Sequence, residues 1–379
     1  MFSTLLRYEL KKLITNKIMM IAFVIMLVAG VTMGLNEEGR SSNRVAAKKS
    51  AERTALDGRA LDDTLLQELS QRSSDEYGLV WNTEDIAYED AASLVIETVG
   101  ENVTLSSIDS DVLYGKRDQM MTEAMDLSCV TDGERSYWEN EAQNVQVPFV
   151  IENVNAPVAM ANGLSNMALL GVFYTTVCLS GVFAGEYRAR TDKLIRSSRY
   201  GNRKLFFAKI SAGIIFALIS MLITAAVFAA VTLAVWGTDG FGAMVQLQCP
   251  FAAVAITQAD LIKRIALLLF ASTLLTAVAS IALSELIRNE TGVIGILTAV
   301  NIGAFAAGLF IPESMRVLSQ AVSMAPMTFI SPRMLYEFRL IGWSGHYLKA
   351  YDFVPVLYLA LSIILLAVCF VHYRKACRK

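Results

Sequence analysis

The chain has 379 residues, of which 54% are hydrophobic, and its formal net charge is −2. The hydrophobic residues gather in uncharged runs of about twenty residues, the length of a helix that crosses a bilayer. This pattern excludes an ordinary water-soluble domain and predicts an all-α polytopic membrane protein with six transmembrane helices. Nothing in the charge balance favours binding to nucleic acid.

The first seventeen residues, MFSTLLRYELKKLITNK, have helical spacing of their apolar side chains. We predict an amphipathic helix over 1–17 on the inner membrane surface, followed by the first span over 18–35. A plain cytoplasmic extension of that span is the alternative. A cleaved signal peptide fits less well, because the leader is long and contains Glu9, and no small-x-small cleavage site follows cleanly. The apolar side of the helix carries Phe2, Leu5, Leu6, Leu10, Leu13 and Ile14.

The segment 36–162 carries 25 acidic and 10 basic residues, whereas the rest of the chain carries 10 acidic and 23 basic residues. The positive-inside rule therefore places this segment outside the membrane. Helix formers surround Leu61, Leu65 and Leu69, and further helical stretches run over 85–99 and 110–127. Asp132-Gly133 and Pro148 indicate turns or ends. We expect a large, mainly helical extracytoplasmic domain.

The remaining spans alternate with short connections that satisfy the same rule. A multi-pass protein of the cell membrane with cytoplasmic N- and C-termini is the result. The uncharged stretches 241–258 and 317–332 are interrupted by prolines, so we expect loops or short helices at the outer interface. The predicted order is a span over 164–185, a cytoplasmic helix over 186–204, a span over 210–236, an outer loop over 237–264, a span over 265–284, a cytoplasmic loop over 285–290, a span over 291–311, an outer loop over 312–352, a span over 353–371 and a cytoplasmic tail over 372–379.

Five cysteines are too few and too scattered for a disulfide framework. Only Cys129 and Cys249 fall on the predicted outer side. A bridge between them is one interpretation, and two free thiols is the favoured one.

Catalytic motifs are absent from the sequence. It contains no G-x-x-x-x-G-K-[ST] phosphate loop and no G-x-S-x-G elbow, and its two histidines form no H-E-x-x-H motif. An enzyme is therefore not expected. The centres of the spans carry almost no ionisable residues, which disfavours an ion-coupled carrier. Energy for transport should come from a partner.

The stretch GEYRARTDKLIRSSRYGNRKLFFAK, residues 185–209, has eight basic and two acidic residues between two spans. Opposite charges at i,i+4 spacing predict a helix that ends near Tyr200, with Gly201 at its C′ position and Asn202 capping the next helix. Such a helix, fixed to spans at both ends, would act as a lever for a partner. The alternative is that the basic residues only set topology and bind anionic headgroups.

This arrangement, with an LLRYELKK leader, one span, a large outer domain and the basic stretch after the second span, resembles permease subunits of ABC-2 type ABC transporters. Glu186, Arg199, Gly201, Arg203 and Lys209 fall at places that match the family pattern. The resemblance implies that the stretch couples to a separate ABC ATPase subunit. That partner would bind ATP and Mg, with no cofactor in this chain. It also implies a second permease copy or paralogue beside this one, and contact with membrane lipids.

Two groups of residues follow as candidate contacts with the ATPase. The first comprises Glu186, Arg188, Arg190, Asp192, Arg196, Arg199, Gly201, Arg203 and Lys204. The second, on the next cytoplasmic loop, comprises Glu285, Arg288 and Glu290.

Small and hydroxyl side chains form two stripes on the later spans. A polar stripe on the fourth span either packs against a neighbouring helix or lines the translocation route. A ridge of small residues on the fifth span predicts a close helix contact. The polar stripe consists of Thr273, Thr276, Ser280 and Ser284, and the ridge of Ala299, Gly303 and Ala307.

The sequence thus favours the permease subunit of an ABC transporter, and an exporter because the resembled family is dominated by exporters. A non-transporting membrane receptor or assembly factor, which binds a ligand through the acidic outer domain, is the alternative. An ion- or proton-coupled carrier is a weaker one. The substrate stays open.

Overall fold

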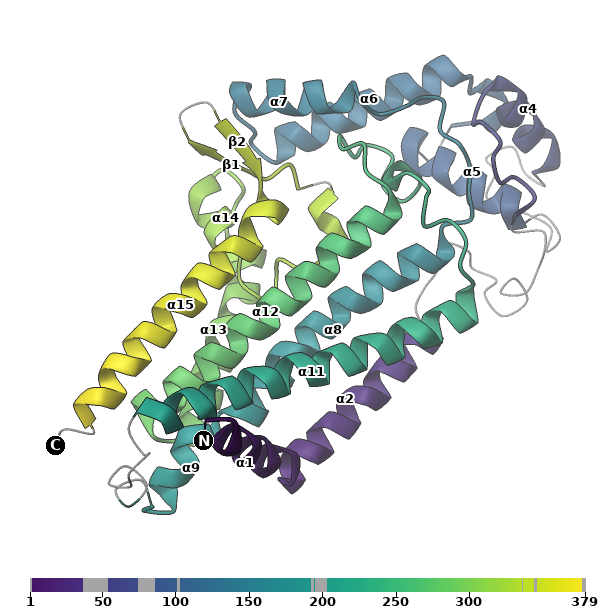
Figure 1. Ribbon diagram of the computed structural model, residues 1–379. Coiled ribbons are helices and arrows are strands. Elements are labelled where there is room, and N and C mark those ends of the chain that lie inside the picture. Colours follow the sequence, from purple (N-terminus) through teal and green to yellow (C-terminus); the bar gives the residue numbers. More distant parts are fainter. Residues whose placement is uncertain are drawn as a thin grey trace.

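The computed structural model describes residues 2–36, 54–73, 86–100, 103–191, 194, 203–335, 337–343 and 346–376. Within these ranges, six helices are long and apolar enough to cross a membrane, and they form one bundle (Figure 1). The predicted all-α polytopic fold is confirmed. The spans are α2 (Lys17–Asn36), α8 (Asn155–Leu179) with its continuation α9 (Gly181–Arg188), α11 (Arg203–Trp236), α12 (Gln258–Ile287), α13 (Glu290–Phe310) and α15 (Ala350–Ala376).

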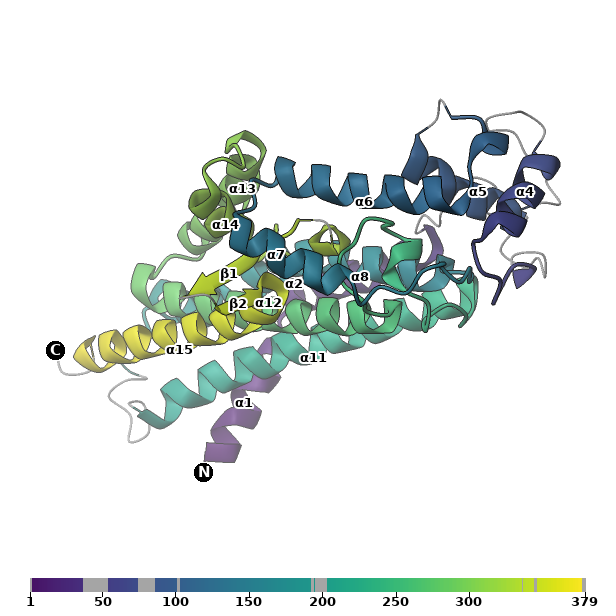
Figure 2. The same ribbon diagram turned by 90° about the horizontal axis from the view of Figure 1, so that it is seen from above.

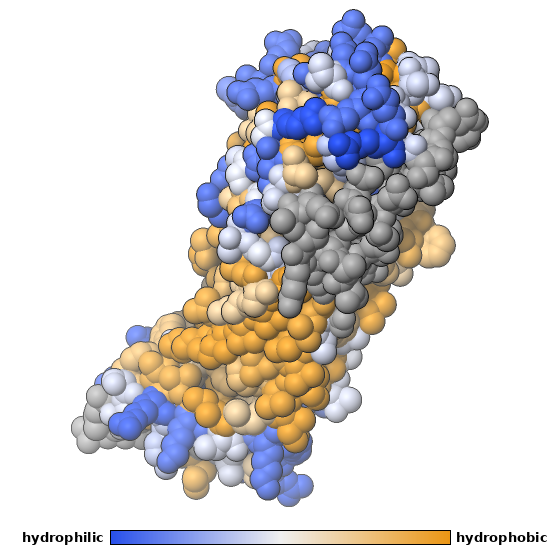
Figure 3. All heavy atoms as spheres, turned by 90° about the vertical axis from the view of Figure 1, so that its right-hand side faces the viewer, coloured by the Kyte–Doolittle hydropathy of each residue, from blue (hydrophilic) through white to orange (hydrophobic). Residues whose placement is uncertain are grey.

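The centre of the bundle is formed by α8 and α12, which pack against each other and are the most buried spans. By contrast, α2, α13 and α15 expose large apolar side chains such as Ile21, Ile296 and Ile363. An apolar belt separates two hydrophilic ends of the molecule (Figure 3). Such a belt is the surface that a helix bundle presents to lipid.

Most of the helices extend beyond the apolar runs that predicted them. The second span begins at Asn155 rather than at residue 164, and α12 begins at Gln258 rather than at residue 265. Thr257 caps the start of α12 by accepting a hydrogen bond from the Asp260 amide at 3.2 Å. Hydropathy marks only the part of a helix that matches hydrocarbon, whereas backbone hydrogen bonding continues into the polar ends. The connections expected over 237–264 and 312–352 are correspondingly shorter.

The N-terminal helix α1 (Phe2–Ile14) is separate from α2, as the amphipathic pattern predicted. Its Leu13 is buried, and Leu6 and Leu10 pack against the core of the bundle. A turn at Thr15 and Asn16 divides the two helices, and the Asn16 side chain accepts a hydrogen bond from the Ile18 amide at 3.0 Å. A plain extension of the first span is therefore excluded, because the chain changes direction at this turn.

Between the first and second spans lies a helical unit that we call the cap domain, residues 54–154. It has its own hydrophobic core, to which Leu61, Leu65 and Leu69 contribute together with Val95 and Phe149. Leu65 and Leu69 lie in the predicted helix, whereas Leu61 precedes it. The expected helices over 85–99 and 110–127 are confirmed. The cap domain comprises α4 (Asp63–Arg72), α5 (Ile86–Val99), η2 (Leu105–Ser107), α6 (Ser110–Leu127) and α7 (Asp132–Ala142).

A turn or a helix end was predicted at Asp132-Gly133, and a helix end lies there, because α7 begins at Asp132 and includes Gly133 in its first turn. Thr131 caps this helix, and its backbone amide donates to the Glu134 carboxylate at 2.9 Å while its hydroxyl donates at 2.7 Å. This capping box satisfies the first turn, so Gly133 is carried inside the helix. The helices α6 and α7 extend in roughly opposite chain directions from a shared turn (Figure 2), and we call them the cap hairpin.

The connections on the cap side contain short elements. The 317–332 stretch includes a short helix, as expected, but the two-stranded antiparallel sheet before α15 was not predicted. Leu340 pairs with Lys349 and Trp343 with His346. Strands of four residues are too short for a period-two pattern to be distinctive. These elements are η3 (Val245–Leu247), α14 (Arg316–Ser323), η4 (Pro332–Leu335), β1 (Leu340–Trp343) and β2 (His346–Lys349).

Candidate functional site

The short helix α9 lies at the end of the bundle that carries both termini (Figure 1). It follows α8 after a break at Ser180. Its first backbone amides need acceptors that a continuous helix would have supplied. The Ser284 hydroxyl of α12 accepts from the amides of Phe183 at 3.1 Å and Ala184 at 2.9 Å. Ser284, from the predicted polar stripe, therefore holds α9 in place.

The predicted continuous helix over 186–204 is wrong, because α9 ends at Arg188. Arg190 adopts a left-handed backbone with φ of 55°. Its amide donates to the Tyr187 carbonyl, and the Thr191 amide donates to the Glu186 carbonyl, both at 3.1 Å. These two bonds are a Schellman motif, which terminates a helix. Asp192, Arg196, Arg199 and Gly201 lie outside the described residues, while Arg203 and Lys204 begin α11 and are exposed.

A buried lysine joins α9 to two other helices. Lys209 of α11 is only 1% exposed, pairs with Glu186 of α9, and lies 3.7 Å from the Glu9 carboxylate of α1. Glu186 also pairs with Lys12 of α1 at 3.4 Å. A buried charge is stable only with close partners, so this cluster fixes α1, α9 and α11 relative to one another. The sequence indicated Glu186 and Lys209 but gave no signal for Glu9 or Lys12 as their partners.

A second group of polar side chains joins α9 to α12 and α15. Glu285 of α12 is fully buried and accepts hydrogen bonds from the Tyr187 hydroxyl at 3.1 and 3.2 Å. Nδ1 of His372 on α15 lies 3.5 Å from the same carboxylate. The Arg288 guanidinium covers the Tyr187 ring at 4.7 Å from its centre. The second group of predicted ATPase contacts, which includes Glu285 and Arg288, therefore lies beside the first group on α9. Tyr187 and His372 also belong here, and the sequence did not indicate them.

A third contact joins α9 to α13. Arg188 pairs with Glu290, the first residue of α13, at 2.8 Å. Two glycines make room for this carboxylate: a Cβ on Gly181 would lie 2.9 Å from the Glu290 Oε1 atom, and one on Gly185 would lie 3.4 Å from it. Because glycine has no side chain, the start of α13 can approach α9 closely at these two positions.

We use the name α9 junction for α9 together with Glu9, Lys12, Lys209, Glu285 and Glu290. Between α1 and α9 it encloses a cavity of about 390 Å³, here called the junction cavity. Both acidic and basic side chains line this cavity, and so does the exposed Thr191. The charged lining residues are Glu9, Lys12, Glu186, Arg188, Lys209 and Glu290.

The polar stripe of α12 packs inside the chain. Thr273, Thr276 and Ser280 are all buried, and α12 packs closely against α8. Thr273 donates to the Leu269 carbonyl at 2.8 Å and Ser280 to the Thr276 carbonyl at 2.7 Å, which are bonds within the same helix. In this conformation the stripe forms a helix contact.

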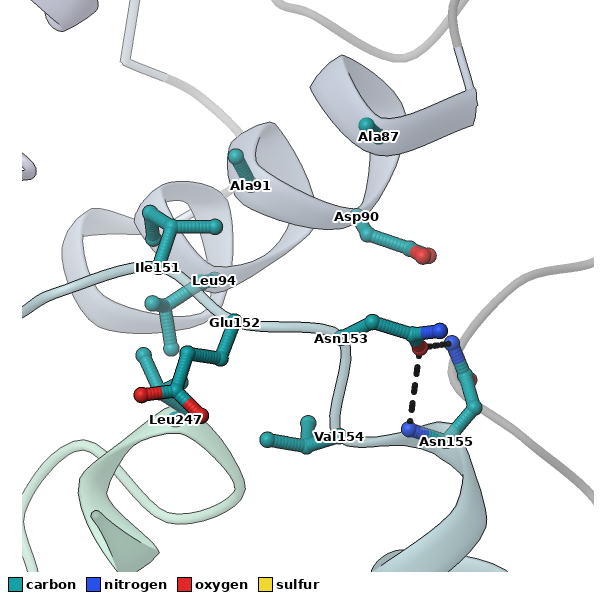
Figure 4. A pocket seen from close by; sticks show the side chains of 10 residues that line it. All are labelled: Ala87, Asp90, Ala91, Leu94, Ile151, Glu152, Asn153, Val154, Asn155 and Leu247. Atoms are coloured by element: carbon teal, nitrogen blue, oxygen red, sulfur yellow. Dashed lines mark hydrogen bonds between the residues drawn. The ribbon is translucent and has the colours of Figure 1, made fainter. Parts of the chain in front are cut away.

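A different pocket lies where the cap domain meets α8. Asp90 of α5 and Asn153 point into the same space, and Glu152 lies beside them (Figure 4). Burial and the charge of Asp57 both raise the pKa of Glu152 above its ordinary value. Despite this acidity, the described parts of the chain contain no group of three histidine, cysteine, aspartate or glutamate side chains that could hold a metal ion.

Six candidate spans, with a polar junction at one end and a polar domain at the other, define a multi-pass membrane protein. The chain matches the model of the ABC-2 family transporter proteins over residues 3–376, and it belongs to that family. Members are membrane components of ABC transporters, so this chain is a permease and is not itself the catalytic subunit. Comparison with curated proteins and with solved structures gave no match.

Proposed function

We propose that this permease forms the translocation path of an exporter and is driven by a separate ATPase subunit that docks at the α9 junction. The observation that carries the proposal is the convergence of four helices on α9. Its eight residues are bonded to α1, α11, α12 and α13 through charged or hydroxyl side chains. A partner that displaced α9 would therefore move most of the bundle.

The charge distribution supports a cytoplasmic α9 junction. Both termini lie at this end, and the segments around it are basic in sequence. The cap domain lies at the opposite end, and the segment 36–162, to which it belongs, has a net charge of −15. Positively charged connections stay in the cytoplasm. In this orientation the junction cavity faces the compartment that contains ATP.

The partner subunit would supply the nucleotide chemistry. The chain has no phosphate loop, so ATP and Mg are assigned to the ATPase. Two permease copies, or this chain and a paralogue, would surround the path, with lipid against the exposed faces of α2 and α15. Export is the direction that the ABC-2 family favours.

The test places a bulky side chain in the lining of the junction cavity. Thr191 is exposed and lines the cavity, so Thr191→Trp should block docking without disturbing the buried contacts. We expect about tenfold or greater loss of ATPase co-purified with the permease, the effect of a substitution at the centre of an interface.

The matched control is Thr122→Trp, at an exposed threonine lining a cavity of similar volume, about 390 Å³, in the cap domain. It should leave ATPase recovery unchanged. Labelling of the exposed Cys129 by an impermeant maleimide in intact cells checks insertion and orientation. Equal ATPase recovery with both variants, or labelling of Cys129 only after lysis, would contradict the proposal.

A further inference from the structure

The span α13 starts at one ion pair and leads, through the short helix α14, to a second one. At the α9 junction, Glu290 pairs with Arg188 at 2.8 Å. At the opposite end, α14 follows α13 after a short turn and carries Arg316. The Arg316 guanidinium donates to the carbonyls of Ser128 at 2.8 Å and Cys129 at 3.2 Å, in the turn between α6 and α7. In the view from above, α13 and α14 lie beside this end of α6 (Figure 2).

The contact at Arg316 is specific and largely buried. Its second terminal nitrogen donates to the Glu134 carboxylate at 2.7 Å, and the Glu134 side chain is only 7% exposed. The same carboxylate caps α7 through Thr131. Separating the partners of such a buried pair would leave an uncompensated charge and is therefore costly. The cap hairpin and α14 should consequently move together.

Between its two ends, α13 is the least buried of the six spans. The predicted close contact at Ala299, Gly303 and Ala307 is not formed with the described residues of this chain, because Ala299 and Gly303 are exposed and none of those residues lies within 4 Å of a Cβ placed on Gly303. A helix of 21 residues is about 30 Å long. It is therefore a stiff element that is guided mainly by its ends.

The cap hairpin has a separate anchor farther from α14. Arg117 of α6 is buried and donates to the carbonyls of Pro250 at 3.1 Å and Ala252 at 3.5 Å, in the connection that leads to α12. Because α12 is among the most buried spans, this anchor is comparatively fixed. A shift of α14 would therefore displace the turn of the hairpin more than its Arg117 end.

We propose that α13 is a connecting rod that links the position of α9 to the turn of the cap hairpin, across the full height of the bundle. The linkage runs from Arg188 through Glu290, along α13, and through Arg316 to Glu134. It is a property of this chain alone and does not depend on the ATPase, so its test is separate from that of the proposed function. A coupling of this kind is established by two sites that bias one element.

The chain provides its own reporter for the test. Cys129 lies in the hairpin turn, is exposed, and is free rather than bridged to the buried Cys249, as favoured from the sequence. Cys178 and Cys369 are also buried. With Cys377→Ser in every sample, the rate of maleimide labelling of the full chain in detergent reports on Cys129.

The experiment is a double-mutant cycle. Glu290→Gln cuts the linkage at the α9 junction, and Arg316→Gln cuts it at the hairpin. We expect Glu290→Gln to raise the labelling rate of Cys129 by about two- to fivefold, the effect of one partly exposed ion pair. In the Arg316→Gln background, Glu290→Gln should have no further effect, because the rod is already disconnected. Glu134→Gln, which keeps the capping box, is a second way to cut the hairpin end.

Lys263→Gln is the matched control, since it breaks an exposed ion pair with Asp260 that involves neither α9 nor α13. It should leave the Cys129 labelling rate unchanged. An unchanged rate in Glu290→Gln, an equal change in Lys263→Gln, or independent multiplication of the Glu290→Gln and Arg316→Gln effects would each overturn the connecting rod.

Discussion

Lys209 is a buried cation whose neutralisation depends on residues from two other helices. Its ammonium pairs with Glu186, lies 3.7 Å from the Glu9 carboxylate, and is 3.5 Å from the Val182 carbonyl. The ring centre of Phe183 is 5.4 Å away. In such a site the penalty for removing a charge from water is offset only while every partner is present.

Replacing this lysine alone should be strongly destabilising. Lys209→Met leaves Glu186 buried with only the more distant Lys12, so we expect a loss of about 3 kcal/mol in the free energy of unfolding. Adding Glu186→Gln to Lys209→Met should restore more than half of that loss, because the uncompensated carboxylate is removed. Thermal unfolding of the purified permease measures both. A double variant as unstable as the single one would contradict this account of the pair.

At the scale of elements, α9 is set by its two ends. Ser284 supports its start, and the Schellman motif at Arg190 closes it. Arginine in a left-handed conformation is strained by its Cβ atom, whereas glycine is not. The helix nevertheless stops there, because both carbonyls at its end are satisfied by the turn.

Relieving this strain should stabilise the permease. Arg190→Gly is expected to raise the free energy of unfolding by about 1 kcal/mol, seen as a higher melting temperature. Arg190→Ala removes the same charge but keeps the Cβ atom, so it should give no such increase. An equal gain from both variants would assign the effect to charge rather than to backbone conformation.

The sequence was most informative about helices that are determined by residues within the helix itself. The spans and cap helices follow from runs and spacings that lie within each element, and they were predicted. The end of α9 was missed because the residue that terminates it is Arg190. Arginine rarely ends a helix in this way, so the later Gly201 was chosen as the terminator. Glu9 and His372 join the junction from places far apart along the chain, so no spacing could have indicated them. The sequence indicated Glu186, Glu285 and Glu290, which lie on α9, near the end of α12 and at the start of α13, and their coupling role stays a prediction.

The whole molecule separates an acidic cap domain from an apolar bundle (Figure 3). Within the cap, carboxylates occupy two opposite kinds of environment. A hydrogen bond from Tyr88 at 2.6 Å and an ion pair with Arg59 at 2.7 Å lower the pKa of Glu68. Glu152 has a raised pKa because it is partly buried and faces Asp57. At neutral pH, ionised Glu68 therefore stabilises the cap domain, whereas ionised Glu152 destabilises it.

Two neutralising variants should separate these two effects. At pH 7, Glu68→Gln should lower the melting temperature and Glu152→Gln should raise it, each by less than about 1 kcal/mol in free energy. The contribution of Glu68 is present above its unfolded pKa and is lost as the pH falls through its lower folded pKa. The cost of ionising Glu152 is present at neutral pH and disappears below its unfolded pKa.

Both differences should therefore shrink as the pH approaches 3, where each wild-type carboxyl is increasingly protonated. Melting curves at pH 7, 5 and 3 provide the measurement. Effects of the same sign at pH 7, or differences that persist unchanged at pH 3, would be inconsistent with the assigned environments.

The buried lysine also bears on the order in which the chain is synthesised. In the described part of the chain, the carboxylates paired with Lys209 are Glu9 and Glu186, and both precede it. When the ribosome delivers the start of α11 to the membrane, its counter-charges have already been made. The residues that neutralise this lysine are therefore all present before the last three spans are made.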